Sequence, residues 1–277
     1  MKLRRRLLGV WGCLLCLGIP LACDEQPAPV PSLSDVAVRF VGRPYAAGPL
    51  EQADGVERLT ADTSAFDCVT LVETALALRR WEQLPGEERS SERFRAFLQD
   101  IRYRGGVLTD YTSRLHYTSD WIADNIGKGW VEDVTVSLAA KAEERFGLQD
   151  VAAVLALDVH LMSRFPGRYP VLRQHPEYTV VMKCIEDGIN ERSMMYIPRI
   201  KLVAVTPFLE DGTIVAFTTG RDGLDFAHLG LVRLVDGVPY LLHASSSARQ
   251  VTVSERPLSD YLAGVSHFSG AVFLRAL

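Results

Sequence analysis

The chain has 277 residues, enough for one large domain or two small ones with a real core. Hydrophobic residues make up 48% and charged residues 23%, which excludes a disordered chain, a collagen or a coiled coil. The 30 Lys and Arg against 34 Asp and Glu give a net charge of −4. Nucleic-acid-binding proteins carry a basic excess on the binding face, so we expect no nucleic acid as a partner.

The N-terminus has the pattern of an export signal. A cationic stretch over residues 2–6 precedes an apolar run over residues 7–22 that is too short for a comfortable membrane span. We therefore expect residues 1–22 to be a signal peptide and the protein to be exported, to the periplasm or the cell envelope. Residues 23–33 then form a tether, and residues 34–277 form one domain.

Cys23 lies where a lipoprotein signal would be cleaved. Ala22 supplies the small residue before the cysteine, although Pro20 replaces the leucine that is usual three residues before it. An ordinary secretory cleavage near Ala22 is the alternative. We favour lipidation of Cys23, because residues 24–31 then make a polar, proline-rich tether, and so we expect a lipid anchor in a membrane.

The remaining cysteines divide sharply. Cys13 and Cys16 lie inside the predicted signal, which leaves Cys68 and Cys184 in the mature domain. Two cysteines in an exported domain of this size are not a disulfide framework. Either they pair once or at least one stays free. We expect Cys184, which follows an apolar run, to be buried and inert.

Helical patterns come first along the chain and strand patterns last. The spacing of apolar residues predicts helices over residues 34–40, 66–81, 91–103 and 113–126. Alternation predicts strands over residues 131–136, 201–206, 213–218, 228–235, 240–244 and 271–275. Residues 169–196 give only weak signals. This order favours an α+β fold with helices packed on a largely antiparallel sheet.

Cys68 lies at the start of the strongest predicted helix. The first amides of a helix have no partner within it and the helix dipole is positive there, so both stabilise a thiolate. The thiolate is the nucleophilic form of cysteine. By position alone, a small buried cysteine that fills the core is an equally good interpretation.

Two histidines lie on strands joined by Asp236 and Gly237. A two-residue turn pairs residue 235 with residue 238, which makes His228 and His243 diagonal neighbours on one face, with Cα atoms roughly 7–8 Å apart. A shift of one residue would separate them to opposite faces. Together with Cys68, the pair suits a nucleophile, its base and the group that orients the base.

The chain contains, in this order, Gly42-Arg43-Pro44-Tyr45, Phe66-Asp67-Cys68-Val69-Thr70, Asp225-Phe226-Ala227-His228-Leu229-Gly230-Leu231-Val232 and His243-Ala244-Ser245-Ser246. These segments resemble the NlpC/P60 superfamily of papain-like cysteine peptidases and amidases. Residues 113–122 and Tyr196-Ile197-Pro198 are similar to one branch, the DUF1460 family, which is described as N-acetylmuramoyl-L-alanine amidase-like.

The resemblance implies a papain-like NlpC/P60 fold and assigns roles residue by residue. Cys68 matches the nucleophile, His228 the general base and His243 the residue that orients the base. Tyr45 matches a tyrosine near the sulfur, whose hydroxyl can donate to an oxyanion. The chemistry needs no metal or other cofactor, and its implied substrate is peptidoglycan or a muropeptide.

The branch resemblance also implies residues that bind substrate. Arg114 can bind a stem-peptide carboxylate with two hydrogen bonds, and Trp121 can stack on a sugar. A helix with a solvated charged face and a buried tryptophan is the alternative. The full set of candidates is Arg114, His116, Asp120, Trp121, Tyr196 and Ser245.

These observations predict a cell-wall cysteine amidase that cleaves the amide between N-acetylmuramic acid and L-Ala. Three alternatives stay open: a stem-peptide endopeptidase of the same fold, a non-catalytic lipoprotein that binds muropeptides, and a Cys68–Cys184 bridge that would abolish the nucleophile. His160 and His175 lack metal-ligand spacing and are expected to be structural.

Overall fold

The computed structural model describes residues 30–277, of which residues 31–277 form one compact unit. The predicted signal peptide, Cys23 and most of the predicted tether lie outside the described residues. Within the described part, none of the helices is both long and apolar enough to cross a membrane.

A sheet of eight strands forms the centre of the unit, and its strands pair antiparallel. The strand order is β2-β3-β8-β4-β5-β6-β7, and β1 also pairs with β8. The expected α+β class is confirmed. The strands are β1 Val131–Asp133, β2 Ala153–Ala156, β3 Ser193–Pro198, β4 Ile214–Thr219, β5 Phe226–Val235, β6 Val238–Ser245, β7 Gln250–Pro257 and β8 Phe268–Ala276.

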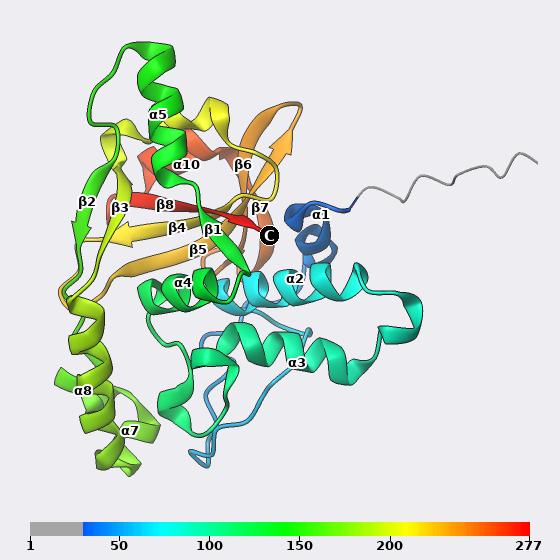
Figure 1. Cartoon of the computed structure of the whole chain (residues 1–277), viewed down its shortest axis with the longest axis vertical. Coiled ribbons are helices and arrows are strands. Elements are labelled where there is room, and N and C mark those ends of the chain that lie inside the picture. The colour runs from blue at the N-terminus through cyan, green and yellow to red at the C-terminus, as the bar shows by residue number, and fades with distance from the viewer. Residues whose placement is uncertain (1–29) are drawn as a thin grey trace, which may run out of the picture. The chain divides into compact units, whose positions relative to one another are not determined.

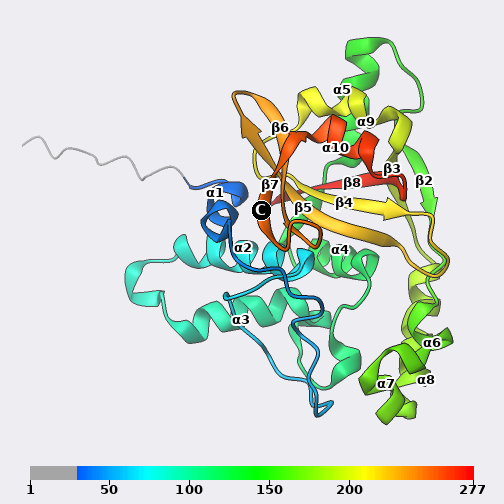
Figure 2. The same ribbon diagram turned by 180° about the vertical axis from the view of Figure 1, so that it is seen from behind.

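Helices cover both faces of this sheet (Figures 1 and 2). The helices α2, α3 and α4 lie on one side, and α5 and α10 on the other. The helices are α1 Leu33–Ala37, α2 Cys68–Glu82, α3 Ser91–Arg102, α4 Thr118–Gly127, α5 Thr135–Phe146, α6 Leu161–Arg164, α7 Pro170–Gln174, α8 Pro176–Asn190, α9 Leu202–Val205 and α10 Leu258–Gly264.

Alternating side chains along the central strands supply an apolar core on each face. Leu229 and Leu231 of β5 pack in the core that includes α2, whereas Val232 packs in the core that includes α5 and α10. This follows from the two-residue period of a strand. Because β5 is covered on both faces, the residues at its start are held in a fixed place.

The helix α2 begins at Cys68 because Asp67 is its N-cap. The Asp67 carboxylate accepts the backbone N–H of Thr70 at 2.8 Å, and the Thr70 hydroxyl accepts the backbone N–H of Asp67 at 3.0 Å. Such a capping box satisfies amides that the first turn leaves free. Leu71 and Val72 then bury the same turn against the sheet, so the thiol is held at a defined position.

Two predicted strands differ from the structure. Residues 201–206 contain the helix α9, because Leu202 and Val205, three residues apart, are both buried. The strand predicted over residues 131–136 ends at Asp133. The Asp133 carboxylate accepts the backbone N–H of Thr135 at 2.8 Å and thereby starts α5.

The predicted helix over residues 113–126 begins only at Thr118. Arg114 instead forms an antiparallel bridge with Tyr103, and the backbone N–H of Leu115 donates to the carbonyl of Arg102. Tertiary pairing has therefore overridden the helical pattern. As a result, Arg114 and His116 lie in an extended link that runs along the end of α3.

The weakly patterned segment over residues 169–196 contains α7, α8 and most of β3. The buried residues of α8 are Met182, Glu186 and Ile189, which share one face. Cys184 lies on the other face and is exposed, so the expectation of a buried Cys184 is wrong. Cys68 and Cys184 are both free thiols, which excludes the bridge between them in this structure.

A buried ion pair ties α2 to α3. The Nε of Arg102 lies 2.7 Å from Oε2 of Glu73, and their side chains are 3% and 2% exposed. Burial raises the pKa of Glu73, and the adjacent Arg102 charge opposes this rise. Arg102 also donates through Nη1 to the carbonyl of Thr60 at 2.6 Å. The pair therefore fixes the helix that carries Cys68 to the loop before it.

Replacing Arg102 with Met would leave the Glu73 carboxyl buried without its cation. We expect Arg102→Met to lower the free energy of unfolding by about 3–5 kcal/mol in urea denaturation. The matched control is Arg39→Met, which breaks an exposed pair with Glu82 and should cost no more than about 1 kcal/mol. Equal losses in the two variants would show that the buried pair has no special role.

Candidate active site

The β5–β6 hairpin brings two histidines into contact. Asp236 and Gly237 have φ values of 51° and 78°, as a two-residue turn of type I′ requires, and Val235 pairs with Val238. The predicted register is confirmed. Nε2 of His228 lies 2.6 Å from Nδ1 of His243, and the ring centroids are 4.8 Å apart with the planes nearly perpendicular. One hydrogen bond thus joins the imidazoles.

Gly230 provides the space for this approach. A Cβ atom at residue 230 would lie 2.7 Å from a methyl group of Leu241 and 3.2 Å from the Cβ of His243. Such distances are shorter than normal van der Waals contact, so even alanine would push the strands or the His243 side chain aside. The glycine in the quoted segment therefore has a packing role directly beside the pair.

Aromatic rings surround both imidazoles. Phe217 stacks nearly parallel to His228 with centroids 6.0 Å apart, and Tyr261 of α10 packs edge-on against His243 at 5.4 Å. Burial, with a smaller effect of His243, lowers the pKa of His228 to about 3. Burial also lowers the pKa of His243 to about 4. Both imidazoles are therefore neutral near pH 7, and because they share one hydrogen bond, only the ring that donates it keeps a free nitrogen to accept a proton.

Cys68 is half-buried, and its sulfur accepts backbone N–H groups of Leu229, Val69 and Cys68 itself. Burial, and next the neighbouring Asp67 charge, raise the pKa of the Cys68 thiol to about 12 despite these amides. The resting group is a thiol, although the amides at the helix N-terminus act in the opposite direction. The physical reason is that loss of solvent outweighs the dipole.

A main-chain contact links the thiol to the strand that carries His228. Leu229, whose N–H donates to the sulfur, directly follows His228 in β5. Within residues 30–277, no hydrogen bond joins the Cys68 thiol to either imidazole. Catalytic hydrogen bonds are often long or poorly aligned before substrate binds. A hydrogen bond between the thiol and an imidazole would therefore form when substrate binds.

Tyr45 lies beside the sulfur. It forms a parallel bridge with Phe66, and its backbone N–H donates to the carbonyl of Arg249 at 2.9 Å. Burial and the adjacent Cys68 raise the pKa of Tyr45. The phenol therefore keeps its proton and can donate it to an oxygen that develops negative charge near the sulfur.

A cavity of about 500 Å³ opens next to His243. Ser245, Arg256, Asp260 and Tyr261 line it together with the histidine. The Ser245 hydroxyl accepts the backbone N–H of Ala248 at 3.1 Å and thereby shapes the turn after β6. Of the predicted substrate-binding residues, Ser245 is thus the one that shares a cavity with a histidine of the pair.

Arg114 is occupied by the chain itself. Its guanidinium lies 2.7 Å from Glu51 and 3.4 Å from Glu57, and its side chain is 6% exposed. It also lies over the ring of Tyr111, 5.0 Å from the centroid. Because two carboxylates already face Arg114, a substrate carboxylate would first have to displace Glu51, the more exposed of the two.

His116 and Asp120 are likewise engaged. Nε2 of His116 lies 2.7 Å from the Tyr111 carbonyl, and burial holds the pKa of this histidine well below its usual value. Asp120 pairs with Arg104 at 2.8 Å and with Arg192 at 2.9 Å. These contacts join α4 to the segments on either side of it, so both residues build the scaffold in this structure.

Trp121 and Tyr196 do not reach the histidine pair. Trp121 is 1% exposed and packs in the core beside α2, so its ring cannot stack on a sugar in this conformation. The alternative interpretation, a buried tryptophan, is therefore the better one. The Tyr196 ring packs against Gly270 of β8, at the β2–β3 side of the sheet.

Asp225 precedes His228 in the same segment, and the sequence alone assigns it no role. It is 6% exposed, and its carboxylate accepts the backbone N–H of Ser119 at 2.7 Å. Because Ser119 lies in the first turn of α4, the carboxylate caps that helix and joins it to the start of β5. The sequence feature that could have pointed to Asp225 is its position three residues before His228. Tyr261 has no such feature.

One group of possible metal ligands occurs among the described residues, namely Asp158, His160 and Asp222. Nδ1 of His160 faces Asp158 and its Nε2 faces Asp222, each at 3.4 Å. The imidazole thus lies between the two carboxylates, and Arg164 lies 3.6 Å from Asp222. The three ligand atoms lie within 4.8 Å of one another, so the structural role expected for His160 stays a prediction.

Comparison with known proteins identifies relatives. A family model described as N-acetylmuramoyl-L-alanine amidase-like matches residues 35–268. An N-acetylmuramoyl-L-alanine amidase from Bacteroides uniformis is similar, with a TM-score of 0.78 and 34% identity over 89% of this chain and 97% of that chain. A proposed xylanase from Bacteroides fragilis has a TM-score of 0.76 and 34% identity over 87% and 99%.

A more distant structure shares the fold. A Legionella pneumophila protein assigned to DUF1460 has a TM-score of 0.67 and 21% identity over 89% of this chain and 88% of that chain. No curated protein matches this chain significantly.

The depressed pKa values of the histidine pair predict how stability depends on pH. Below about pH 6.5 the two histidines become protonated in the unfolded chain but stay neutral in the native protein. The free energy of unfolding therefore falls as the pH falls. Between about pH 6.5 and pH 5, each imidazole should contribute a loss on the order of 2 kcal/mol. This fall in the free energy of unfolding should be smaller in His228→Gln and in His243→Gln, because each variant lacks one of the two imidazoles. Urea denaturation at each pH measures it. Parallel curves for wild type and both variants would contradict these pKa directions.

Proposed function

Because this chain belongs to the N-acetylmuramoyl-L-alanine amidase-like family, we propose that it is a cysteine amidase of the cell wall. It hydrolyses the amide between N-acetylmuramic acid and L-Ala in peptidoglycan or muropeptides. The observation that carries the proposal is the hydrogen-bonded pair His228–His243 beside the peptide unit that contacts the Cys68 sulfur. A nucleophile, a base and an orienting group are the parts that acyl transfer needs.

In the proposed mechanism His228 acts as the base. Its neutral imidazole takes the proton of the Cys68 thiol as the sulfur attacks the amide carbonyl, so no resting thiolate is required. His243 holds the His228 ring through the bond to Nε2 and leaves Nδ1 as the nitrogen that serves the thiol. A protonated His228 then donates to the leaving amine, and afterwards activates the water that releases the acyl group.

The proposed oxyanion site combines main-chain and side-chain donors. The N–H groups of Cys68, Val69 and Leu229 already converge on the sulfur. The protonated Tyr45 hydroxyl is near enough to Cys68 for the sulfur to raise its pKa. Preorganised donors of this kind stabilise the charge that develops on the carbonyl oxygen.

The chemistry gathered here favours acyl transfer over glycoside hydrolysis. The proposed xylanase from B. fragilis is named for an activity that normally uses two paired carboxyl groups. In this chain Asp67, the carboxylate next to Cys68, is engaged as the N-cap of α2. The thiol and the imidazole pair are the groups that fit the family match.

We further propose that the fold is of the papain-like NlpC/P60 type, with the nucleophile at a helix N-terminus and the base on the sheet that the helix packs against. We also propose that the protein is exported and anchored through a lipid on Cys23. Incorporation of labelled fatty acid into wild type but not into Cys23→Ala tests the anchor, and incorporation into neither would contradict it.

The nucleophile assignment is tested with Cys68→Ala. We expect this variant to lose at least about 10³-fold in turnover on a defined muropeptide, because no other group can form the thioester. Mass spectrometry of the products should show a peptide that begins with L-Ala. The variant should keep the wild-type midpoint of thermal unfolding, since alanine fits the half-buried site. Retained turnover in a folded Cys68→Ala would refute the assignment.

The two histidines should not be equivalent. Loss of the general base in His228→Ala should reduce turnover by roughly 10²–10⁴-fold. His243→Ala removes only the orienting group and should cost less. Measuring kcat for both variants on the same muropeptide decides the order. Equal effects, or a larger loss in His243→Ala, would mean that the roles are exchanged.

A further inference from the structure

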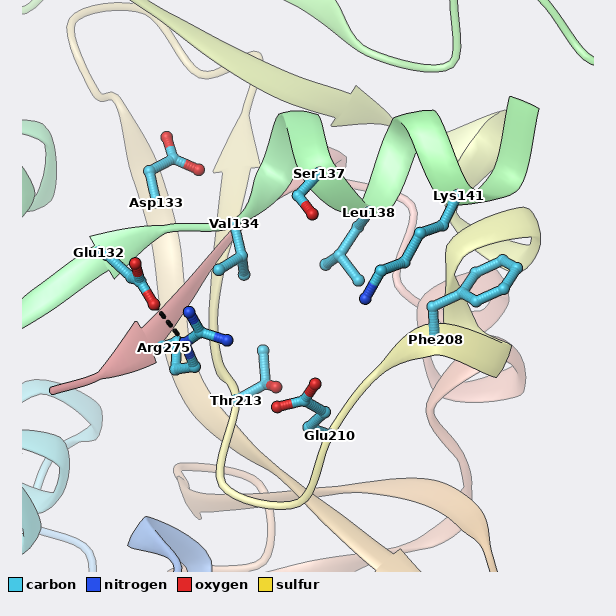
Figure 3. Close-up of a pocket in the computed structure, with 10 residues that line it drawn as sticks. All are labelled: Glu132, Asp133, Val134, Ser137, Leu138, Lys141, Phe208, Glu210, Thr213 and Arg275. Carbon is cyan, nitrogen blue, oxygen red and sulfur yellow. Dashed lines mark hydrogen bonds and ion pairs between the residues drawn. The ribbon is translucent and has the colours of Figure 1, made fainter. Parts of the chain in front are cut away.

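A second hollow lies away from the candidate active site (Figure 3). It has a volume of about 270 Å³ and lies between the start of α5, the end of β8 and the segment that precedes β4. We call it the α5–β8 pocket and define it by six of its lining residues, which are Leu138, Lys141, Phe208, Glu210, Thr213 and Arg275.

The pocket is remote from the histidine pair along the same strands. Arg275 and Phe268 lie seven residues apart in β8, which corresponds to more than about 20 Å of extended chain. Phe268 stacks nearly parallel to His228 at 6.4 Å, so the histidine lies at the far end of β8. The pocket is therefore separate from the proposed catalytic groups.

Charges of both signs face into the pocket. Figure 3 shows Lys141 and Arg275 reaching toward the hollow from opposite sides, with the Glu210 carboxylate between them. Hydrogen bonding to Glu132 raises the pKa of Arg275, and the more distant Glu210 charge adds to this effect. Glu132 engages the Nε of Arg275, which leaves the outer N–H groups of the guanidinium for another acceptor.

Within the described part of the chain, the side chains of Lys141 and Glu210 have no hydrogen-bonded or ion-pair partner. Thr213, which is 7% exposed, also lines the pocket. Leu138 and Phe208 supply apolar surface on the α5 side. A pocket with a few converging polar groups and an apolar wall has the usual make-up of a small-molecule site.

Two further carboxylates line the pocket, but Glu132 is paired with Arg275 and Asp133 accepts the backbone N–H of Thr135. The charges left to meet a ligand are those of Lys141, Arg275 and Glu210, and their signs decide what kind of ligand fits. A simple anion would be attracted by Lys141 and Arg275 but repelled by Glu210. A simple cation would be attracted by Glu210 but repelled by the two basic groups. A molecule that carries an ammonium and a carboxylate on neighbouring atoms satisfies all three groups at once.

We propose that the α5–β8 pocket binds a small zwitterionic α-amino acid. Its carboxylate lies between Lys141 and Arg275, its ammonium faces Glu210, and a small apolar side chain packs against Leu138 and Phe208. The site holds the ligand without a covalent step. Because the pocket is separate from the catalytic groups, the binding does not depend on the proposed amidase activity.

The test uses the full chain with three probes in isothermal titration. Alanine carries both charges, acetate carries the carboxylate alone, and alanine methyl ester carries the ammonium alone. We expect saturable binding of alanine, at least about tenfold tighter than either single-charge probe. Absence of saturable alanine binding, or equal binding of alanine and acetate, would overturn the proposal.

Variants give the charge assignment its own test. Glu210→Gln should weaken alanine at least about tenfold while strengthening acetate, because it removes the partner of the ammonium and the repulsion of the anion. Lys141→Met should weaken both ligands. The matched control is Lys183→Met on α8, an exposed lysine outside the pocket, which should change neither. If Glu210→Gln weakens the binding of acetate as well, Glu210 does not distinguish the ammonium from the carboxylate, and the proposal is wrong.

The outcome also separates this proposal from the amidase assignment. Cys68→Ala should bind alanine as wild type does, whatever its turnover. An active enzyme without alanine binding would refute the pocket alone, whereas an inactive enzyme with selective alanine binding would refute the amidase alone. Loss of alanine binding in Cys68→Ala would contradict the independence of the two sites.

Discussion

The hydrogen bond between Nε2 of His228 and Nδ1 of His243 depends on the register of a single hairpin. Asp236 and Gly237 set that register through their positive φ values, and Gly230 leaves room for the His243 side chain. Slippage by one residue would send the imidazoles to opposite faces of the sheet. The sheet and the helices on both faces hold the two strands in the one alignment that makes the pair possible.

Burial determines the protonation states of the site. It raises the pKa of the Cys68 thiol and lowers the pKa of both imidazoles, so the resting groups are all neutral. Neutral groups avoid the cost of uncompensated charges in the interior. In the proposed reaction charge therefore develops only as the proton moves from sulfur to nitrogen, next to main-chain donors that are already in place.

Local sequence patterns are sufficient to predict the structural features that depend on residues close together in the chain. A helix that begins near Cys68 and the β5–β6 register follow from short-range chemistry, and both could be predicted from the sequence, although the pattern begins the helix at Phe66 and the structure at Cys68. The surroundings of Arg114 could not. Its partners Glu51 and Glu57 lie more than fifty residues earlier, and a strand-like bridge to Tyr103 replaces the helix that its own segment favours. Likewise, Trp121 shows the same helical spacing whether its face meets solvent or α2, so only the tertiary packing decides its burial.

The central claim is that His228 serves the Cys68 thiol, and chemical modification tests it most directly. Peptide mapping after brief exposure to iodoacetamide at neutral pH reports Cys68 and the exposed Cys184 in the same sample. Because a neighbouring base assists the half-buried thiol, modification of Cys68 should slow at least about tenfold in His228→Ala, with Cys184 unchanged. An equal rate at Cys68 in wild type and His228→Ala would contradict the account.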